Sequence, residues 1–154
     1  MTKGWLLDTN IVSELRKPNC NTNVRAWSER HPSQVFFLST VTLAEIRFGI
    51  EKVNDLAFQK ELEDWLEKEL RPWFLDRILA IDEDVILVWR KMVDAGRRVG
   101  YTFSQPDLFI AATAAVHDLT VATRNVSDFE RSGVSVFDPF LFTDGDGSPQ
   151  ENTP

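Results

Sequence analysis

Short apolar runs alternate with longer amphipathic segments along most of the chain. Each run is bounded by polar residues, as expected of strands that are buried on both faces of a parallel sheet. Helical patterns separate the runs, so we expect a three-layer α/β domain in which helices cover a central, mostly parallel sheet. The five predicted strands lie at residues 5–7, 35–38, 77–81, 119–123 and 134–137.

The segments between the predicted strands carry apolar residues at helical spacing. In the fourth helical segment, Leu56, Leu62, Leu66 and Leu70 should face inward while acids and lysines face solvent. Pro72 is expected to end that helix, because proline lacks the N–H that continues it. The predicted helical segments are residues 9–17, 23–30, 41–53, 55–70, 82–98 and 104–116, with a turn or short helix at 125–131.

Four acidic residues fall on the loop side of successive strand–helix units. Parallel strands end at one edge of their sheet, and α/β proteins place their sites at that edge. Carboxylates that converge there repel one another unless a cation or a proton lies among them. Oxygen ligands without a cluster of His or Cys favour Mg²⁺ or Mn²⁺ over zinc, and such a centre suits the hydrolysis of phosphodiesters. The four candidates are Asp8, Glu45, Asp107 and Asp128.

Each of these acids also has an ordinary structural explanation. Asp8 can cap the helix that follows it. Glu45 and Asp107 each lie three residues after a Thr or Ser, which is the spacing of a capping box. Asp128 can be a turn residue. The coincidence of four acids on one predicted edge, in otherwise apolar elements, favours a metal site over four separate caps.

The net charge complicates a nucleic-acid partner. The chain carries a formal charge of −7 at pH 7, whereas proteins that grip a phosphate backbone rely on Lys and Arg. Three negative charges lie near the C-terminus, at Asp144, Asp146 and Glu151. Divalent ions would also offset the charge of the proposed ligands. The objection from net charge is therefore weakened but remains.

Composition and cysteine usage suggest where the domain ends and where the protein works. The last residues are rich in Gly, Pro and polar side chains, so we expect a domain over residues 1–140 and a flexible polar and acidic tail over 141–154. No apolar run has the length that a bilayer needs, and the N-terminus lacks a signal-peptide core. A lone Cys20 suggests a reducing, cytoplasmic setting.

Several blocks of the sequence resemble a known family. Their order and spacing over residues 3–140 are similar to those of PIN-domain toxins, in the VapC/FitB-like group of type II toxin–antitoxin ribonucleases. This resemblance implies a PIN-like fold and an Mg²⁺- or Mn²⁺-dependent endoribonuclease with one or two ions. The blocks are LLDTNIVSEL at 6–15, TLAEIRFGI at 42–50, PDLFIAATAAVHDLTVATRNVSDF at 106–129 and VSVFDPF at 134–140.

The resemblance also assigns roles to individual residues. It implies that the four acids bind metal, and that a second polar set orients ligands or water. That set is Thr9, Asn10, Thr123 and Asn125. Positively charged side chains could contact RNA phosphates or an antitoxin, although each of them alone is as readily a solvated surface charge. These candidates are Arg47, Lys52, Arg97, Arg98 and Arg124.

The resemblance further implies partners. A small antitoxin would hold the protein inactive by laying its C-terminal segment in the acidic groove and offering a basic residue to the carboxylates. A homodimer or a toxin–antitoxin hetero-oligomer is expected, and no membrane partner.

Three other functions compete with this interpretation. An aspartyl phosphatase also begins with an Asp at a strand end, but it needs a second Asp two residues later, where this chain has Asn10. A dinucleotide-binding domain is disfavoured because no glycine-rich turn follows the first strand. A PIN-fold module that binds without catalysis stays open. Catalysis by a Ser–His or Cys–His pair has little support, because Ser39 and Cys20 lack a partnered histidine in their sequence context.

Overall fold

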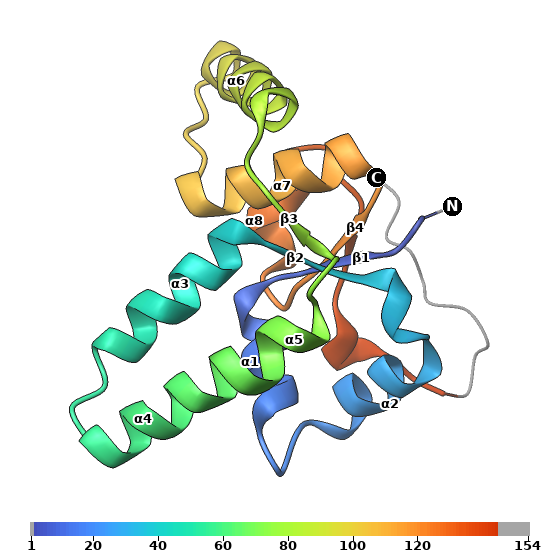
Figure 1. Ribbon diagram of the computed structural model, residues 1–154. Coiled ribbons are helices and arrows are strands. Elements are labelled where there is room, and N and C mark those ends of the chain that lie inside the picture. Colours follow the sequence, from blue (N-terminus) through green and yellow to red (C-terminus); the bar gives the residue numbers. More distant parts are fainter. Residues whose placement is uncertain (1, 145–154) are drawn as a thin grey trace.

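The computed structural model describes residues 2–144, and the predicted tail from residue 145 onward lies outside the described residues. Its centre is a sheet of five strands in the order β3-β2-β1-β4-β5, and every neighbouring pair is parallel. The predicted parallel α/β architecture is confirmed (Figure 1). The strands are β1 Trp5–Leu7, β2 Phe36–Ser39, β3 Ile78–Leu79, β4 Thr120–Ala122 and β5 Val136–Phe137.

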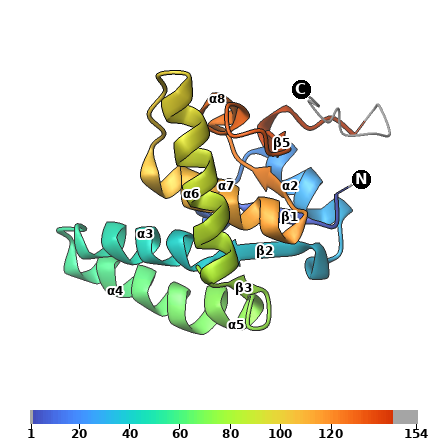
Figure 2. The ribbon, with the colours of Figure 1, turned by 90° about the horizontal axis from the view of Figure 1, so that it is seen from above.

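Helices cover both faces of this sheet (Figures 1 and 2). The principal helices are α1 Thr9–Arg16, α2 Thr22–Arg30, α3 Thr40–Glu51, α4 Leu56–Trp65, α5 Arg71–Trp73, α6 Glu83–Arg98, α7 Gln105–His117 and α8 Val126–Glu130. Short 3₁₀ turns lie at Ser33–Val35 and Pro139–Leu141. No helix within residues 2–144 is both long enough and apolar enough to cross a bilayer.

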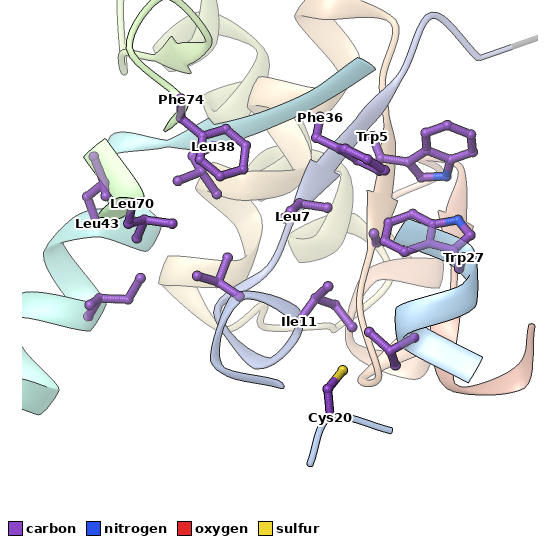
Figure 3. Packing of buried hydrophobic residues seen from close by; sticks show 14 of the residues in the cluster. Trp5, Leu7, Ile11, Cys20, Trp27, Phe36, Leu38, Leu43, Leu70 and Phe74 are labelled. Atoms are coloured by element: carbon purple, nitrogen blue, oxygen red, sulfur yellow. The ribbon is translucent and has the colours of Figure 1, made fainter. Parts of the chain in front are cut away.

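Side chains alternate between two cores because successive strand residues point to opposite faces. Trp5 and Leu7 enter a core with α1, α2 and α3, whereas Leu6 enters a second core with α7 and α8. Figure 3 shows the first core, where the rings of Trp5, Trp27 and Phe36 lie together. Burial on both faces explains why the central strands read as uninterrupted apolar runs.

The helix predicted over residues 55–70 differs from the one observed. It does not end at Pro72: a π-helical turn, Leu66–Leu70, follows α4, and α5 carries the helix on to Trp73. The wider turn accommodates the proline ring, whose missing N–H needs no acceptor. Leu56, expected to face inward, is 78% exposed because α4 begins at the far end of a hairpin with α3, beyond the reach of the sheet (Figure 1).

The packed part of the chain extends past residue 140. Phe142 is buried in the core that contains Trp27, and Asp144 forms an exposed ion pair with Arg30 at 3.0 Å. The edge strands β3 and β5 are shorter than the predicted runs, because each pairs on one side only. Both differences leave the centre of the sheet, where the site lies, unchanged.

Candidate functional site

The order of the strands reverses between β1 and β4, the two central neighbours in the sheet. Strands β2 and β3 lie on one side of β1, and strands β4 and β5, which come later in the sequence, lie on the other side. Such a switch point leaves a crevice at the carboxyl ends of the strands. Asp8 directly follows β1, and Thr123 directly follows β4, so both lie at this crevice.

Hydrogen bonds hold the Asp8 carboxylate in place. Its Oδ2 accepts from the Thr123 hydroxyl at 2.8 Å and from the Asn10 amide at 3.3 Å, and its Oδ1 accepts from the Thr9 N–H at 2.8 Å. The Thr123 hydroxyl also accepts from the Asn125 N–H at 3.0 Å. Asp8 is 5% exposed and is the N-cap of α1. The capping explanation is thus correct for Asp8, yet the cap belongs to a network that joins β1 to β4.

Glu45 comes from α3, and it does not form the capping box that its spacing suggested. The cap of α3 is Ser39, whose hydroxyl accepts from the Val41 N–H at 3.1 Å. Thr42 therefore lies inside the helix, fully buried. Within residues 2–144, neither the Thr42 hydroxyl nor Oε1 of Glu45 has a hydrogen-bond partner, although both atoms are buried.

Asp107 comes from the first turn of α7. Ser104 is the N-cap residue of that helix, but its hydroxyl makes no cap hydrogen bond to the helix backbone. A hydrogen bond between the Ser104 and Asp107 side chains instead lowers the pKa of Asp107 and so favours its ionised form. The second predicted capping box is therefore absent as well, and capping does not account for Asp107. Asp128 lies in the first turn of α8.

The acids act on one another electrostatically. Burial, and then the charges of Asp8 and Asp128, raise the pKa of Asp107 to about 6, against the smaller opposing effect of Ser104. Burial, followed by Asp8 and Asp107, raises the pKa of Glu45. Burial also raises the pKa of Asp8; hydrogen bonds from Thr123 and Thr9 oppose this rise, and the charge of Asp128 adds to it. These couplings place all four predicted acids in one charged neighbourhood.

The residues present fit a hydrated divalent cation. None of the four acids forms an ion pair with a Lys, Arg or His in the described part of the chain, so their charge is not neutralised. Between residues 2 and 144, no three acidic, His or Cys side chains are already close enough to enclose a metal ion. An open arrangement of carboxylates matches Mg²⁺, which keeps several of its waters. The unpartnered oxygen of Glu45 is an available ligand.

The remaining predicted contacts come from three parts of the chain. The backbone N–H of Arg124 donates to the side-chain oxygen of Asn10 at 3.1 Å. The Arg124 guanidinium lies over the Phe140 ring, 4.4 Å from its centroid. Arg47 lies within α3, and Lys52 is the residue that ends this helix. Arg97 and Arg98 are exposed in the last turn of α6. Arg98 forms an ion pair with Asp94 at 4.0 Å.

Two hydroxyl groups near the acids, one buried and one exposed, were not foreseen as neighbours of the site. Thr42 was considered only as a helix cap, and Ser104 likewise. Their one available signal is the placement of a Ser or Thr among apolar residues, just before an acid. That signal is weak, because the same pattern marks an ordinary helix start.

Known proteins share this sequence and fold. Residues 5–133 match the family model described as PIN domain. Toxin FitB of Neisseria gonorrhoeae is 36% identical over 135 residues, 88% of this chain and 97% of FitB. VapC ribonuclease Y4jK of Sinorhizobium fredii is 33% identical over 88% of this chain and 96% of its own length.

Solved structures agree with this relationship. FitAcB from Neisseria gonorrhoeae superposes with a TM-score of 0.84 at 36% identity, covering 90% of this chain and 99% of that one. A DNA-bound VapBC from Salmonella typhimurium superposes with a TM-score of 0.72 at 25% identity, covering 88% and 98%. The chain therefore belongs to the PIN-domain family, and within it to the VapC/FitB-like toxins of toxin–antitoxin systems.

Proposed function

We propose that this protein is an Mg²⁺- or Mn²⁺-dependent endoribonuclease, the toxin of a type II toxin–antitoxin pair. Its relatives include a protein named as a VapC ribonuclease, which supports RNA as the substrate. The observation that carries the proposal is the group of four coupled acids at the carboxyl edge of the sheet, which no cation within residues 2–144 neutralises. The similar structure of VapBC bound to DNA supports an antitoxin as partner, and we infer that the antitoxin blocks this site.

Asp8 and Asp107 are the direct ligands in this proposal, and Glu45 and Asp128 complete the coordination directly or through water. One or two bound ions would supply a water of lowered pKa and would stabilise charge on the attacked phosphate and on the leaving oxygen. The polar residues around Asp8 fix its orientation, as partners of ligands do in other metal sites. The N-terminus of α7 carries a partial positive charge that favours a phosphate nearby.

Metal removal tests the proposed activity. With the purified protein and total cellular RNA, we expect site-specific cleavage in Mg²⁺ or Mn²⁺ and none in excess EDTA, because the carboxylates alone repel the phosphate. Sequencing of the RNA ends reports cleavage and the cut site together. Cleavage that persists in EDTA contradicts the metal dependence, and an absence of cleavage in either metal favours a PIN-fold module that binds without catalysis.

A further inference from the structure

The hydroxyl of a fully buried threonine on α3 lacks the partner that such a group normally has. Thr42 is 0% exposed, and within residues 2–144 its hydroxyl oxygen makes no hydrogen bond. Thr113 is equally buried on α7, but its hydroxyl donates to the Phe109 carbonyl at 2.8 Å. Buried polar groups without a partner cost folding free energy and are rare in proteins. A polar ligand beside Thr42 would account for this one.

Thr42 lies on the same side of α3 as Glu45. Successive residues of a helix are turned by about 100°, which places these two between a side that packs with α1 and a side that faces α7. The side toward α1 is formed by the core residues Leu43, Ile46 and Ile50. The side toward α7 is formed by Val41, Ala44 and Phe48. The side opposite Thr42 and Glu45 is exposed, at Arg47 and Glu51. Thr42 and Glu45 therefore face the angle between α1 and α7.

The acids of the site lie in this angle. Asp8 caps α1, and Asp107 lies in the first turn of α7. After the larger effect of burial, the charges of both raise the pKa of Glu45, which agrees with a position of Glu45 between them. Thr42 lies one turn before Glu45, nearer to β2, and is the more deeply buried of the two. Its hydroxyl is therefore at the inner end of the acidic site.

Thr42 and Glu45 offer two hydrogen-bond acceptors within reach of one water molecule. Residues three apart in a helix have Cβ atoms about 5–6 Å apart. Oε1 of Glu45 is buried without a partner in the described part of the chain, as the Thr42 hydroxyl is, so the two groups are not bonded to each other. A water of a hydrated cation turns its oxygen to the ion and donates both protons outward. A carboxylate oxygen and a hydroxyl oxygen can accept one proton each.

The ligand that fits beside Thr42 is small. Because this side chain has no exposed surface, an RNA phosphate could reach its hydroxyl only by displacing packed residues. A water needs only a space of its own size and two or more polar partners. The hydroxyl of Thr9, at the start of α1 beside Asp8, is also buried and has no partner within residues 2–144. The inner end of the site is thus polar enough for water.

We propose that Thr42 is a positioning residue of the metal site, whose hydroxyl and Oε1 of Glu45 each accept one proton of the same water of the hydrated cation. Thr42 touches neither the substrate nor the ion and acts through that water. Holding the water in one orientation favours the bound cation, as hydrogen bonds around the ligands do in other metal sites. This inference rests on the proposed metal-dependent function.

Two substitutions at Thr42 separate its hydroxyl from its methyl group. Thr42→Val keeps the shape and loses the hydroxyl, whereas Thr42→Ser keeps the hydroxyl and loses the methyl. We expect Thr42→Val to weaken Mn²⁺ binding about tenfold or more, measured by electron paramagnetic resonance of the free ion, and Thr42→Ser to bind close to the wild type. In EDTA the order of Tm should be the reverse. Thr42→Val removes an unsatisfied buried group and should not lower the Tm, and Thr42→Ser opens a small cavity and should lower it.

A double substitution tests whether Thr42 and Glu45 hold the same water. Once Glu45→Ala has removed one acceptor, adding Thr42→Val should weaken Mn²⁺ binding little further, because groups that act together are not additive. A loss equal to the product of the two single losses would contradict the shared water. Thr113→Val is the matched control, since Thr113 is as buried as Thr42 but its hydroxyl is already bonded within α7. It should bind Mn²⁺ as the wild type does.

The results distinguish this inference from the proposed function. If the wild type binds Mn²⁺ and Thr42→Val binds it equally, the role of Thr42 is wrong and the metal site stands. If Thr42→Ser loses as much affinity as Thr42→Val, packing is responsible and the role is also wrong. Should Thr42→Val not fold, Thr42→Ser and Thr42→Ala differ only in the hydroxyl and give the same comparison.

RNA cleavage in Mg²⁺, assayed in parallel, judges the ribonuclease separately. A wild type that binds Mn²⁺ but cleaves no RNA removes the endoribonuclease, while weaker binding by Thr42→Val still supports the role of Thr42. A wild type that binds no Mn²⁺ overturns both.

Discussion

Replacing Asp107 by Asn is expected to reduce RNA cleavage by at least about a hundredfold, since a metal centre supplies several kcal/mol of transition-state stabilisation. Asn keeps the shape of the side chain but loses the charge that would hold the ion. Asp107 is a better choice than Asp8, because Asp8 also caps α1 and accepts from the buried Thr123 hydroxyl. Loss of Asp8 would therefore affect folding as well as activity.

The same substitution should stabilise the metal-free protein at neutral pH. The pKa of Asp107 is raised from 3.8 to about 6, so between these values the folded protein binds more protons than the unfolded chain. Stability then falls as pH rises through this window. Asn does not titrate, and the variant avoids that loss. We expect a gain on the order of 1 kcal/mol at pH 7.5, discounted because the carboxyl is partly solvated, and almost none at pH 4.

Urea unfolding in EDTA at the two pH values, with cleavage assays in parallel, measures both effects of Asp107→Asn. Asp64→Asn is the matched control, because Asp64 lies on α4 between Lys60 and Lys68 and its charge is paired. It should cleave normally and gain no stability. A fully active Asp107→Asn would remove Asp107 from the site. If the stability difference between Asp107→Asn and the wild type is smaller at pH 7.5 than at pH 4, the mutual repulsion of the acids is contradicted.

Truncating Trp27 to Ala is expected to cost about 3–5 kcal/mol of folding free energy, the usual range for a large buried aromatic side chain. Trp27 is fully buried, and its ring lies 5.6 Å from Trp5 and 5.1 Å from Phe36 between ring centroids. Trp27→Ala would open a cavity between α2 and the sheet. Urea unfolding measures the change.

Trp27→Phe provides the comparison. The indole N–H of Trp27 has no hydrogen-bond partner in the part of the chain that the structure describes, so Phe removes an unsatisfied donor while it keeps an aromatic ring. We expect Trp27→Phe to lose much less stability than Trp27→Ala. A loss below about 1 kcal/mol for Trp27→Ala would contradict the packing of this core.

The sheet could be predicted from the sequence because burial on both faces leaves a local signal. The runs around Leu6, Leu38 and Val121 are mostly apolar, with Thr120 beside Val121, and Leu6, Leu38 and Val121 are all fully buried. The position of Asp8 could be foreseen for a related reason: parallel strands deliver their carboxyl ends to one edge, so an acid placed directly after a buried strand has a known location. Asp107 was expected at a strand end, but it begins a helix that follows α6 rather than a strand.

Features that depend on tertiary surroundings could not be read in this way. The spacing of Leu56 matches an inward face, but the hairpin of α3 and α4 carries that turn away from the sheet. Pro72 ends a regular helix but not one that widens into a π-turn. The capping-box spacing before Glu45 is equally compatible with a helix that starts earlier, at Ser39. A local pattern fixes which residues can cap or face inward, and packing decides which do.

Uptake of Mn²⁺ by the metal-free protein tests the proposed centre most directly. Titration followed by electron paramagnetic resonance of the free ion should give saturable binding of one or two ions to the wild type. Asp107→Asn and Glu45→Gln should each weaken this binding at least about tenfold, while Asp64→Asn should bind as the wild type does. A wild-type protein that takes up no Mn²⁺, or variants that all bind it equally, would show that these acids do not share a metal ion.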